Sequence, residues 1–140
     1  MSERQSVRDL PGVAQFAKTV SEGDVYQFAG LSGDLHPVHV NAEYAANQPV
    51  GQRIAHGVIL IGLMSAACTA WARREGIDIV SYGWDGVRFI KPVFFGDTIT
   101  TSYAMDPERQ PEGKKYFALA DAFNQRGELV GVGQHILYAT

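Results

Sequence analysis

The fold of this chain is decided by the stretch from residue 56 to residue 74, which reads HGVILIGLMSAACTAWARR. Its residues are apolar or small on nearly every side of a helix, until the two arginines at the end. A helix with this pattern is buried all round rather than along one stripe. Gly76 follows as a stop signal. The stretch therefore predicts a long buried helix from about His56 to Arg74.

The sequence after this helix is rich in β-branched and aromatic residues and is interrupted by turn residues. This pattern predicts four consecutive strands, over residues 77–90, 98–105, 116–123 and 129–138. Residues 124–127 are a good hairpin turn between the last two strands. One long helix followed by four strands predicts an α+β fold, in which an antiparallel sheet curls around the buried helix.

The half of the chain before the long helix predicts short helices joined by loops. Ser21 is a suitable N-cap for a helix over residues 21–30, and Asn41 can cap a second short helix. Residues 31–39 and 47–53 each contain a glycine and a proline, and are therefore predicted to be loops.

Length and composition indicate a single domain over residues 1–140, because a chain of this length supports one core and is too short for two. The formal net charge of −3 argues against a nucleic-acid partner, since nucleic-acid-binding proteins usually carry a basic face. The single cysteine, Cys68, excludes a disulfide bond within the chain.

No membrane partner and no export signal are expected. The apolar run from Val58 to Ala72 is shorter than the ~20 residues that a membrane-spanning helix needs. The first ten residues are polar and lack the apolar core of a signal peptide. The sequence therefore predicts a cytoplasmic protein.

A carboxylate and two imidazoles lie close together in residues 33–39, which read GDLHPVH. Pro37 restricts its own φ and favours an extended backbone at His36, so the side chains of this loop are held with little slack. A carboxylate beside an imidazole can act as a general acid–base pair near neutral pH. Asp34 and His39 are therefore the candidate catalytic residues.

These residues alone leave two alternatives open. Aspartate and histidine beside a proline turn commonly cap a helix or satisfy the loop backbone. Asp34, His36 and His39 could also ligate a metal ion. However, no third histidine or cysteine stands at a familiar zinc spacing, so no metal is expected.

The start of the long helix is a candidate oxyanion site. Gly57 would lie in the first turn, where backbone N–H groups have no intrahelical partner and the helix dipole is positive. Donors held in place in this way stabilise an oxygen that becomes negative in a transition state. Ser65 falls on roughly the same helix face and could support a buried polar group. A glycine kept for packing and a serine bonded to its own helix are the alternatives.

His135 lies in the last predicted strand, in phase with Gly131 and Gly133. This phase is opposite to that of Val132 and Ile136. We therefore predict an ordinary histidine on the sheet surface rather than a catalytic one.

Three blocks of the sequence together resemble the MaoC-like (R)-specific enoyl-CoA hydratases. Residues 28–39, FAGLSGDLHPVH, resemble the hydratase motif, which reads approximately Ala-x-x-Ser-x-Asp-x-Asn-Pro-x-His. Residues 55–57, AHG, resemble the start of the family's central helix, and residues 89–97, FIKPVFFGD, resemble its strand junction F-x-x-P-V-x-x-G-D. The order and spacing of the blocks agree with the family.

The resemblance implies a homodimer of the hot-dog fold that hydrates a trans-2-enoyl-CoA to an (R)-3-hydroxyacyl-CoA. Coenzyme A would enter as part of this acyl-thioester substrate, and no other cofactor is implied. Asp34 and His39 would hold and activate the water, and the backbone N–H of Gly57 would be the oxyanion donor. Ser65 would lie near the catalytic carboxylate.

The chain departs from the motif at His36, where the family has asparagine. A neutral imidazole offers one donor and one acceptor and could replace the amide. We therefore expect His36, like His56, to be a supporting residue.

Two rival functions remain. A hot-dog acyl-CoA thioesterase would place water at the carbonyl carbon. A non-catalytic acyl-thioester-binding subunit would have no need of an acid–base pair.

Overall fold

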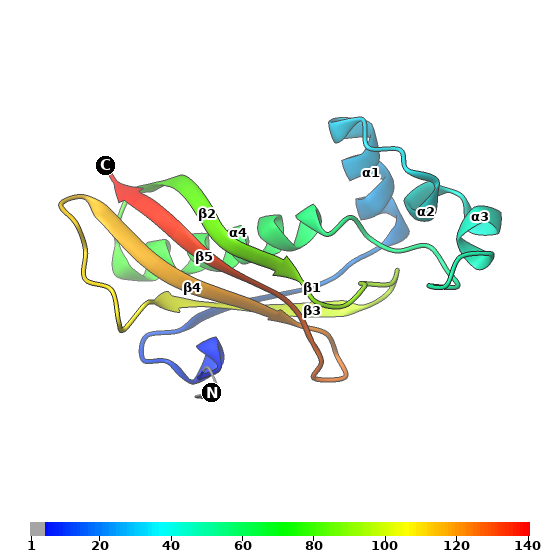
Figure 1. Ribbon diagram of the computed structural model, residues 1–140. Helices are drawn as coiled ribbons and strands as arrows, with labels where there is room; N and C mark the ends of the chain where they lie inside the picture. The colour runs from blue at the N-terminus through cyan, green and yellow to red at the C-terminus, as the bar shows by residue number, and fades with distance from the viewer. Residues whose placement is uncertain (1–4) are drawn as a thin grey trace.

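The computed structural model describes residues 5–140, in which an antiparallel sheet curls around one long helix, α4 (Val58–Glu75), as Figure 1 shows. Residues 1–4, part of the N-terminal stretch considered above for an export signal, lie outside the described residues. The predicted α+β architecture is confirmed. Among the described residues, no helix is long and apolar enough to cross a membrane.

The sheet has five strands in the spatial order β1–β3–β4–β5–β2. Four of them lie where the sequence predicted strands: β2 (Ile79–Phe89), β3 (Thr98–Met105), β4 (Lys115–Phe123) and β5 (Leu129–Ala139). The prediction of four strands missed β1 (Ala14–Thr19), which pairs antiparallel with β3. The sequence of β1, AQFAKT, lacks the regular alternation of apolar and polar residues that marks a strand. Of its six residues, only Ala14 is buried.

One side of α4 fills the concave face of the sheet and forms the core. Met64, Ala67, Cys68 and Trp71 are buried there against residues of β3, β4 and β5. Gly76 ends the helix in the left-handed conformation, with φ of 67°, as the sequence predicted.

The other side of α4 is exposed, so the prediction of a helix buried all round is wrong for this single chain. Val58, Gly62, Ser65 and Thr69 recur at helical spacing and are all exposed. The physical reason is that a single curled sheet covers only the side of the helix that faces it. The sequence concealed this because the exposed positions are small or apolar as well.

Three short helices precede α4 and lie beyond one end of the sheet (Figure 1). They are α1 (Glu22–Ser32), α2 (Pro37–Val40) and α3 (Ala42–Ala46). Ser21 caps α1 as predicted: its Oγ accepts the Asp24 N–H at 3.0 Å, and the Asp24 carboxylate accepts the Ser21 N–H at 2.9 Å. A short 3₁₀ helix, η1 (Val7–Asp9), precedes β1.

The predicted loop over residues 31–39 is shorter than expected. Helix α1 continues to Ser32, and α2 begins at Pro37, whose fixed φ suits the first position of a helix. Asn41 caps α3 as predicted, because its Oδ1 accepts the Tyr44 N–H at 2.9 Å. The loop is thus reduced to a short segment held between two helices.

The prediction that His135 lies on the sheet surface is wrong, because its side chain is only 1% exposed. Its Nδ1 lies 2.7 Å from the Tyr103 hydroxyl and its Nε2 lies 2.8 Å from the Ser81 Oγ. Its ring stacks on Trp84 at 4.2 Å between centroids. Gly133 misled the prediction: it lies on the crowded inner face, where an added Cβ would meet Trp84 at 3.0 Å.

We expect His135 to make the stability of the fold sensitive to acid. Burial lowers the pKa of His135 from 6.5 to about 4. Between these values the unfolded chain binds a proton that the folded chain does not, so the free energy of unfolding falls as the pH drops through this interval. The expected loss is about 2 kcal/mol between about pH 7.5 and about pH 4.5, measured by urea unfolding. His135→Gln should reduce this loss, and an unchanged pH dependence in the variant would contradict the assignment.

Candidate active site

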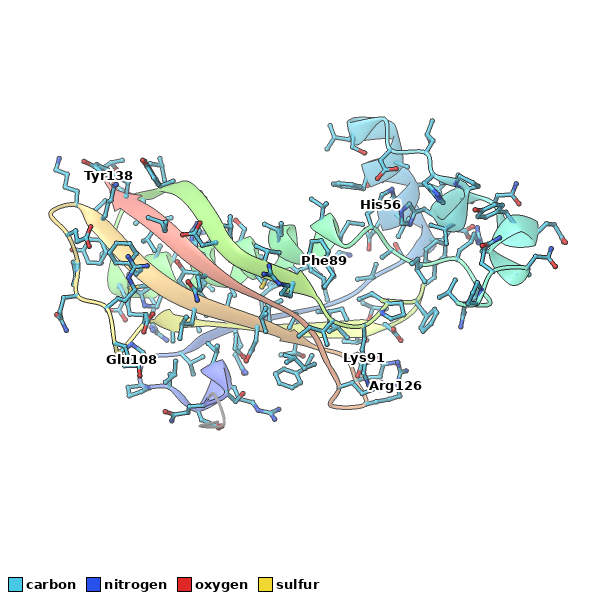
Figure 2. All side chains as sticks on the ribbon, viewed as in Figure 1. His56, Phe89, Lys91, Glu108, Arg126 and Tyr138 are labelled. Carbon is cyan, nitrogen blue, oxygen red and sulfur yellow. The ribbon has the colours of Figure 1, made fainter. Side chains whose placement is uncertain are left out.

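The site is assembled from two separate segments of the chain. Asp34 lies in the loop after α1, and His39 lies in α2. His56 and Gly57 come immediately before α4. Figure 2 shows His56 at the junction where the start of α4 meets the layer of α1–α3.

Arg53 and Tyr26 tie these segments together. The Arg53 guanidinium lies 2.6 Å from the Glu22 carboxylate and donates to the Tyr26 hydroxyl at 2.8 Å. The Tyr26 hydroxyl in turn donates to the carbonyl of Val40 at 2.9 Å. Helices α1 and α2 and the loop before α4 are therefore held in one arrangement.

The His39 ring is oriented by the backbone of the loop before α4. Its Nδ1 lies 2.7 Å from the carbonyl oxygen of Ile54. A carbonyl can only accept, so Nδ1 carries the proton and Nε2 keeps its lone pair when the ring is neutral. Burial lowers the pKa of His39, opposed by the Ile54 carbonyl and assisted by the nearby His56. The ring is thus prepared to accept a proton at Nε2.

Asp34 is exposed, but its position is restricted by local hydrogen bonds. Its Oδ1 accepts the His36 N–H at 3.3 Å, and its own N–H donates to the Ser32 Oγ at 3.1 Å. A turn of this kind needs only the aspartate and its neighbours. The carboxylate is therefore oriented, and no hydrogen bond from residues 5–140 reaches its second oxygen, which could accept from a water or a substrate.

Three side chains gather at this point. Donor and acceptor atoms of Asp34, His39 and His56 all lie within 4.8 Å of one another. The rings of His39 and His56 stack, with centroids 3.7 Å apart and planes inclined by 25°. These are residue types that could hold a metal ion. The sequence had suggested His36 as the third possible ligand beside Asp34 and His39, but the structure places His56 there. Their spacing also suits the exchange of protons through a water molecule.

His36 is not part of this group and caps α2. Its Nδ1 accepts the Val38 N–H at 3.1 Å. Its ring centroid lies 6.1 Å from that of His39 and 5.9 Å from that of Tyr44. An asparagine side chain could accept the same N–H. Histidine can therefore replace the asparagine of the motif without loss of this hydrogen bond.

We therefore expect His36→Asn to retain most of the activity. The amide oxygen should take over the bond to the Val38 N–H, so the rate should stay within about threefold, since N-caps of similar strength exchange at little cost. The pH profile should keep its shape because His36 lies outside the group of Asp34, His39 and His56. Steady-state kinetics across the pH range checks this, and a loss as large as that of His39→Asn would show that the wrong histidine was chosen.

Gly57 is the N-cap of α4, with φ of −54° and ψ of −36°. Among the described residues, no acceptor is found for its N–H. A Cβ at this position would meet the Phe89 ring at 2.4 Å, so the glycine is required by packing. The packing explanation therefore holds, and it leaves the N–H available to a ligand at the positive end of the helix.

Ser65 is not brought to the Asp34–His39 group within this chain. It is exposed on α4, eight residues after Gly57, which is about 12 Å along the helix axis. In the part of the chain that the structure describes, the hydrogen bonds of Asp34, His39 and His56 go to other residues, and none joins them to the Ser65 hydroxyl. Its expected role beside the carboxylate remains a prediction.

An apolar groove of about 510 Å³ lies beside the site, between α1 and the first half of α4. Its floor includes Phe28, Val58, Ile59, Gly62 and Leu63. Phe28 also packs against His56, with ring centroids 4.8 Å apart, so the groove reaches the polar group directly. The Lys18–Asp24 ion pair, at 2.9 Å, stands at its edge.

Sequence reasoning missed the groups that hold the site together. The Ile54 carbonyl and the Phe89 ring have no motif of their own, and their roles depend on how distant segments pack. His56 was expected only as a supporting residue, and its signals were that it directly precedes Gly57 and lies in the AHG block.

The sheet curled around α4, with the Asp–His group at one end of the helix, defines a protein of the hot-dog fold. The chain belongs to the MaoC-like domain family, whose model matches residues 10–120. An (R)-hydratase from Aeromonas caviae has the same fold, with a TM-score of 0.80 and 26% identity over 91% of this chain and 94% of that chain. An R-hydratase from Pseudomonas aeruginosa gives a TM-score of 0.77 and 32% identity, covering 91% of this chain and 79% of that chain.

Among curated relatives, an (R)-specific enoyl-CoA hydratase from Rhodospirillum rubrum is 42% identical over 64% of this chain and 60% of its own length. A 3-hydroxybutyryl-CoA dehydratase from Methylorubrum extorquens is 37% identical over 59% of this chain and 50% of its own length. The match thus spans about half to three fifths of these two proteins.

Proposed function

We propose that this protein is an enoyl-CoA hydratase that adds water to a trans-2-enoyl-CoA to give an (R)-3-hydroxyacyl-CoA, and that also catalyses the reverse dehydration. The observation that carries the proposal is the group of Asp34, His39 and His56 next to Gly57, whose N–H finds no acceptor among residues 5–140. Relatives from Rhodospirillum rubrum and Aeromonas caviae are (R)-specific enoyl-CoA hydratases, and one from Methylorubrum extorquens is a 3-hydroxybutyryl-CoA dehydratase, which supports the same chemistry.

In this proposal Asp34 and His39 hold and activate one water molecule. The free lone pair on His39 Nε2 accepts one hydrogen of the water as its oxygen attacks the β-carbon of the substrate. The Asp34 carboxylate accepts the other hydrogen in a hydrogen bond and so orients the attack. The proton taken by His39 is then delivered to the α-carbon, so that the whole water molecule ends on the product and the ring is neutral again.

The N–H of Gly57 would stabilise the negative charge that develops during this attack. As water adds to the β-carbon, electrons move to the thioester oxygen and form an enolate. A backbone donor at the N-terminus of α4 adds the positive end of the helix dipole to the hydrogen bond. No redox chemistry is involved, and coenzyme A enters as part of the substrate.

The apolar groove between α1 and α4 would take the acyl chain. It begins at Phe28 and Val58, next to the polar group, and its volume falls within the usual range for small-molecule sites. Gly62 lines the groove, and a Cβ there would meet no atom within 4 Å. The absence of a side chain at Gly62 therefore leaves room for the chain.

Filling this space should shorten the accepted acyl chain. We expect Gly62→Leu to lower kcat/KM for trans-2-octenoyl-CoA by about tenfold or more, the usual effect of denying a few methylenes their pocket. The value for crotonyl-CoA should change little. Thr69→Leu, which adds a leucine to the same exposed side of α4 outside the groove, is the control. Equal losses on both substrates would show that the acyl chain lies elsewhere.

The direct test of the proposed function is a hydration assay over a panel of enoyl-CoAs. We expect loss of the absorbance of the conjugated thioester and formation of the (R)-3-hydroxy product, identified by chiral chromatography. Release of free coenzyme A without hydration would identify a thioesterase. Binding of substrate without any turnover would identify an acyl-thioester-binding subunit.

We also propose that two copies of the chain associate through β2. This strand is an edge of the sheet, and it exposes Val80, Tyr82 and Phe89. Ile90, which directly follows it, is exposed as well. Long edge strands with exposed apolar residues invite pairing, and a two-fold interface would cover both copies at once. Sedimentation at micromolar concentration should give a dimer that Tyr82→Lys weakens. A monomeric wild-type protein would overturn this proposal.

A further inference from the structure

His56 is buried against the two proposed catalytic side chains but has little access to a substrate. Only 2% of its surface is exposed. One neighbour of its ring is His39, at 3.7 Å between centroids, and another is Phe28, at 4.8 Å. A side chain in this position acts on the reaction through the groups that it touches.

The ring is bonded to the backbone of the other catalytic residue. His56 Nε2 lies 2.8 Å from the carbonyl oxygen of Asp34, a residue that is 22 positions away in the sequence. Because the carbonyl can only accept, Nε2 carries the proton and donates. This hydrogen bond joins the exposed Asp34 loop to the start of α4, where Gly57 lies.

The second ring nitrogen of His56 is buried and has no hydrogen-bond partner among the described residues. The ring is thus held through its Nε2 donor and through its flat face, which lies against His39. The position therefore uses two properties of imidazole together: a flat face for His39 and a single donor for Asp34. Phenylalanine offers only the face, and asparagine offers only the donor.

We propose that His56 is the positioning residue of the site, which holds the Asp34 backbone through its donated hydrogen bond and the His39 ring through stacking. This inference rests on the proposed hydration by Asp34 and His39. It gives His56 a role that the resemblance to the hydratase motif does not specify. The ionisable groups that face His39 are Asp34, His36 and His56. Of these, His56 is the one in stacking contact.

Two substitutions separate the two functions of His56. His56→Phe keeps a flat ring against His39 but removes the donor to Asp34. We expect kcat for crotonyl-CoA to fall by about tenfold to a hundredfold with little change in KM, since a misplaced catalytic group loses rate on that scale. The pKa of His39 should rise less than in His56→Asn, because phenylalanine keeps the ring of His39 buried and removes only the repulsion from the second imidazole.

His56→Asn keeps a donor near the Asp34 carbonyl but removes the stacked ring. Water then reaches His39 more easily, and the repulsion from a second imidazole is lost. We expect the pKa of His39 to rise and the acid limb of the kcat/KM profile to move to higher pH. The pKa is followed by NMR of the His39 ring C–H proton, which requires no activity.

His135→Asn serves as the matched control, because it removes another buried histidine outside the site. It should lower the unfolding temperature without moving the His39 titration. Folded His56 variants with wild-type kcat and an unchanged His39 titration would overturn the positioning role. If the wild-type protein hydrates no enoyl-CoA, the proposed function fails, and the NMR titration still decides whether His56 controls His39.

Discussion

Asp34→Asn and His39→Ala are each expected to lower kcat for enoyl-CoA hydration by about 100-fold or more, the usual scale for a positioned general acid or base. Asparagine keeps the shape of Asp34 and can still accept the His36 N–H, so the loop should remain folded. What is lost is the charge that orients the water. Alanine at position 39 removes the Nε2 lone pair that accepts the proton.

The double variant distinguishes a working pair from two independent contributions. If both side chains act on one water molecule, removing the second should cost much less than removing the first. Glu43→Gln is the matched control for the carboxylate change, because Glu43 is an exposed carboxylate in the same helical layer. Near-normal turnover in either single variant would contradict the assignment of the pair.

The pH dependence gives an independent check on His39. Its pKa is lowered below 6.5, chiefly by burial, and the ring must be neutral to accept a proton. The rate should therefore be lost only as the pH falls below the ordinary value for histidine, and the acid limb of kcat/KM should lie under about pH 6.5. His39→Ala should lose this limb in its residual activity.

The second large effect is expected at Gly57. The Cβ of Gly57→Ala would lie 2.4 Å from the Phe89 ring, so the start of α4 or the ring must shift. Overpacking of this kind costs about 1–3 kcal/mol of stability. Displacement of the N–H should lower kcat by about 100-fold, the scale seen when an oxyanion donor is lost.

Phe89→Ala in the same chain tests the cause. With the ring removed, Gly57→Ala should recover both its unfolding temperature and most of its rate. Gly62→Ala is the control for stability, because it adds the same methyl group to α4 where no atom lies within 4 Å. If the double variant is no better than Gly57→Ala alone, the loss comes from something other than Phe89.

Local features of the sequence were enough to predict most of the helices and strands. The apolar run of α4 ended by Gly76, the hairpin turn before β5 and the Ser21 cap all act over a few residues. The loop carrying Asp34 and His39 was also visible, since their spacing and Pro37 lie within one short segment. Such features can be read in order along the chain because their causes are neighbouring residues.

Two of the wrong predictions concerned which side of a helix or strand is covered by other residues. The buried histidine at 135 and the exposed side of α4 were both misjudged, because small residues stand on crowded and on open faces alike. Gly133 makes room for Trp84, whereas Gly62 faces an open groove. One sequence letter gives no means of telling these two situations apart.

The sequence by itself determined which groups could do chemistry, and the tertiary structure decided how they are held. Asp34, His39 and Gly57 were named from local patterns, but the bonds that orient them join residues 15 and 22 positions apart. Those bonds form only when α1–α3 fold back against the start of α4. Before that, closing such loops costs conformational entropy that no single hydrogen bond repays. Burial of the core around α4 supplies the rest of the free energy that closing these loops requires. The fold therefore had to be known before a role could be proposed for His56.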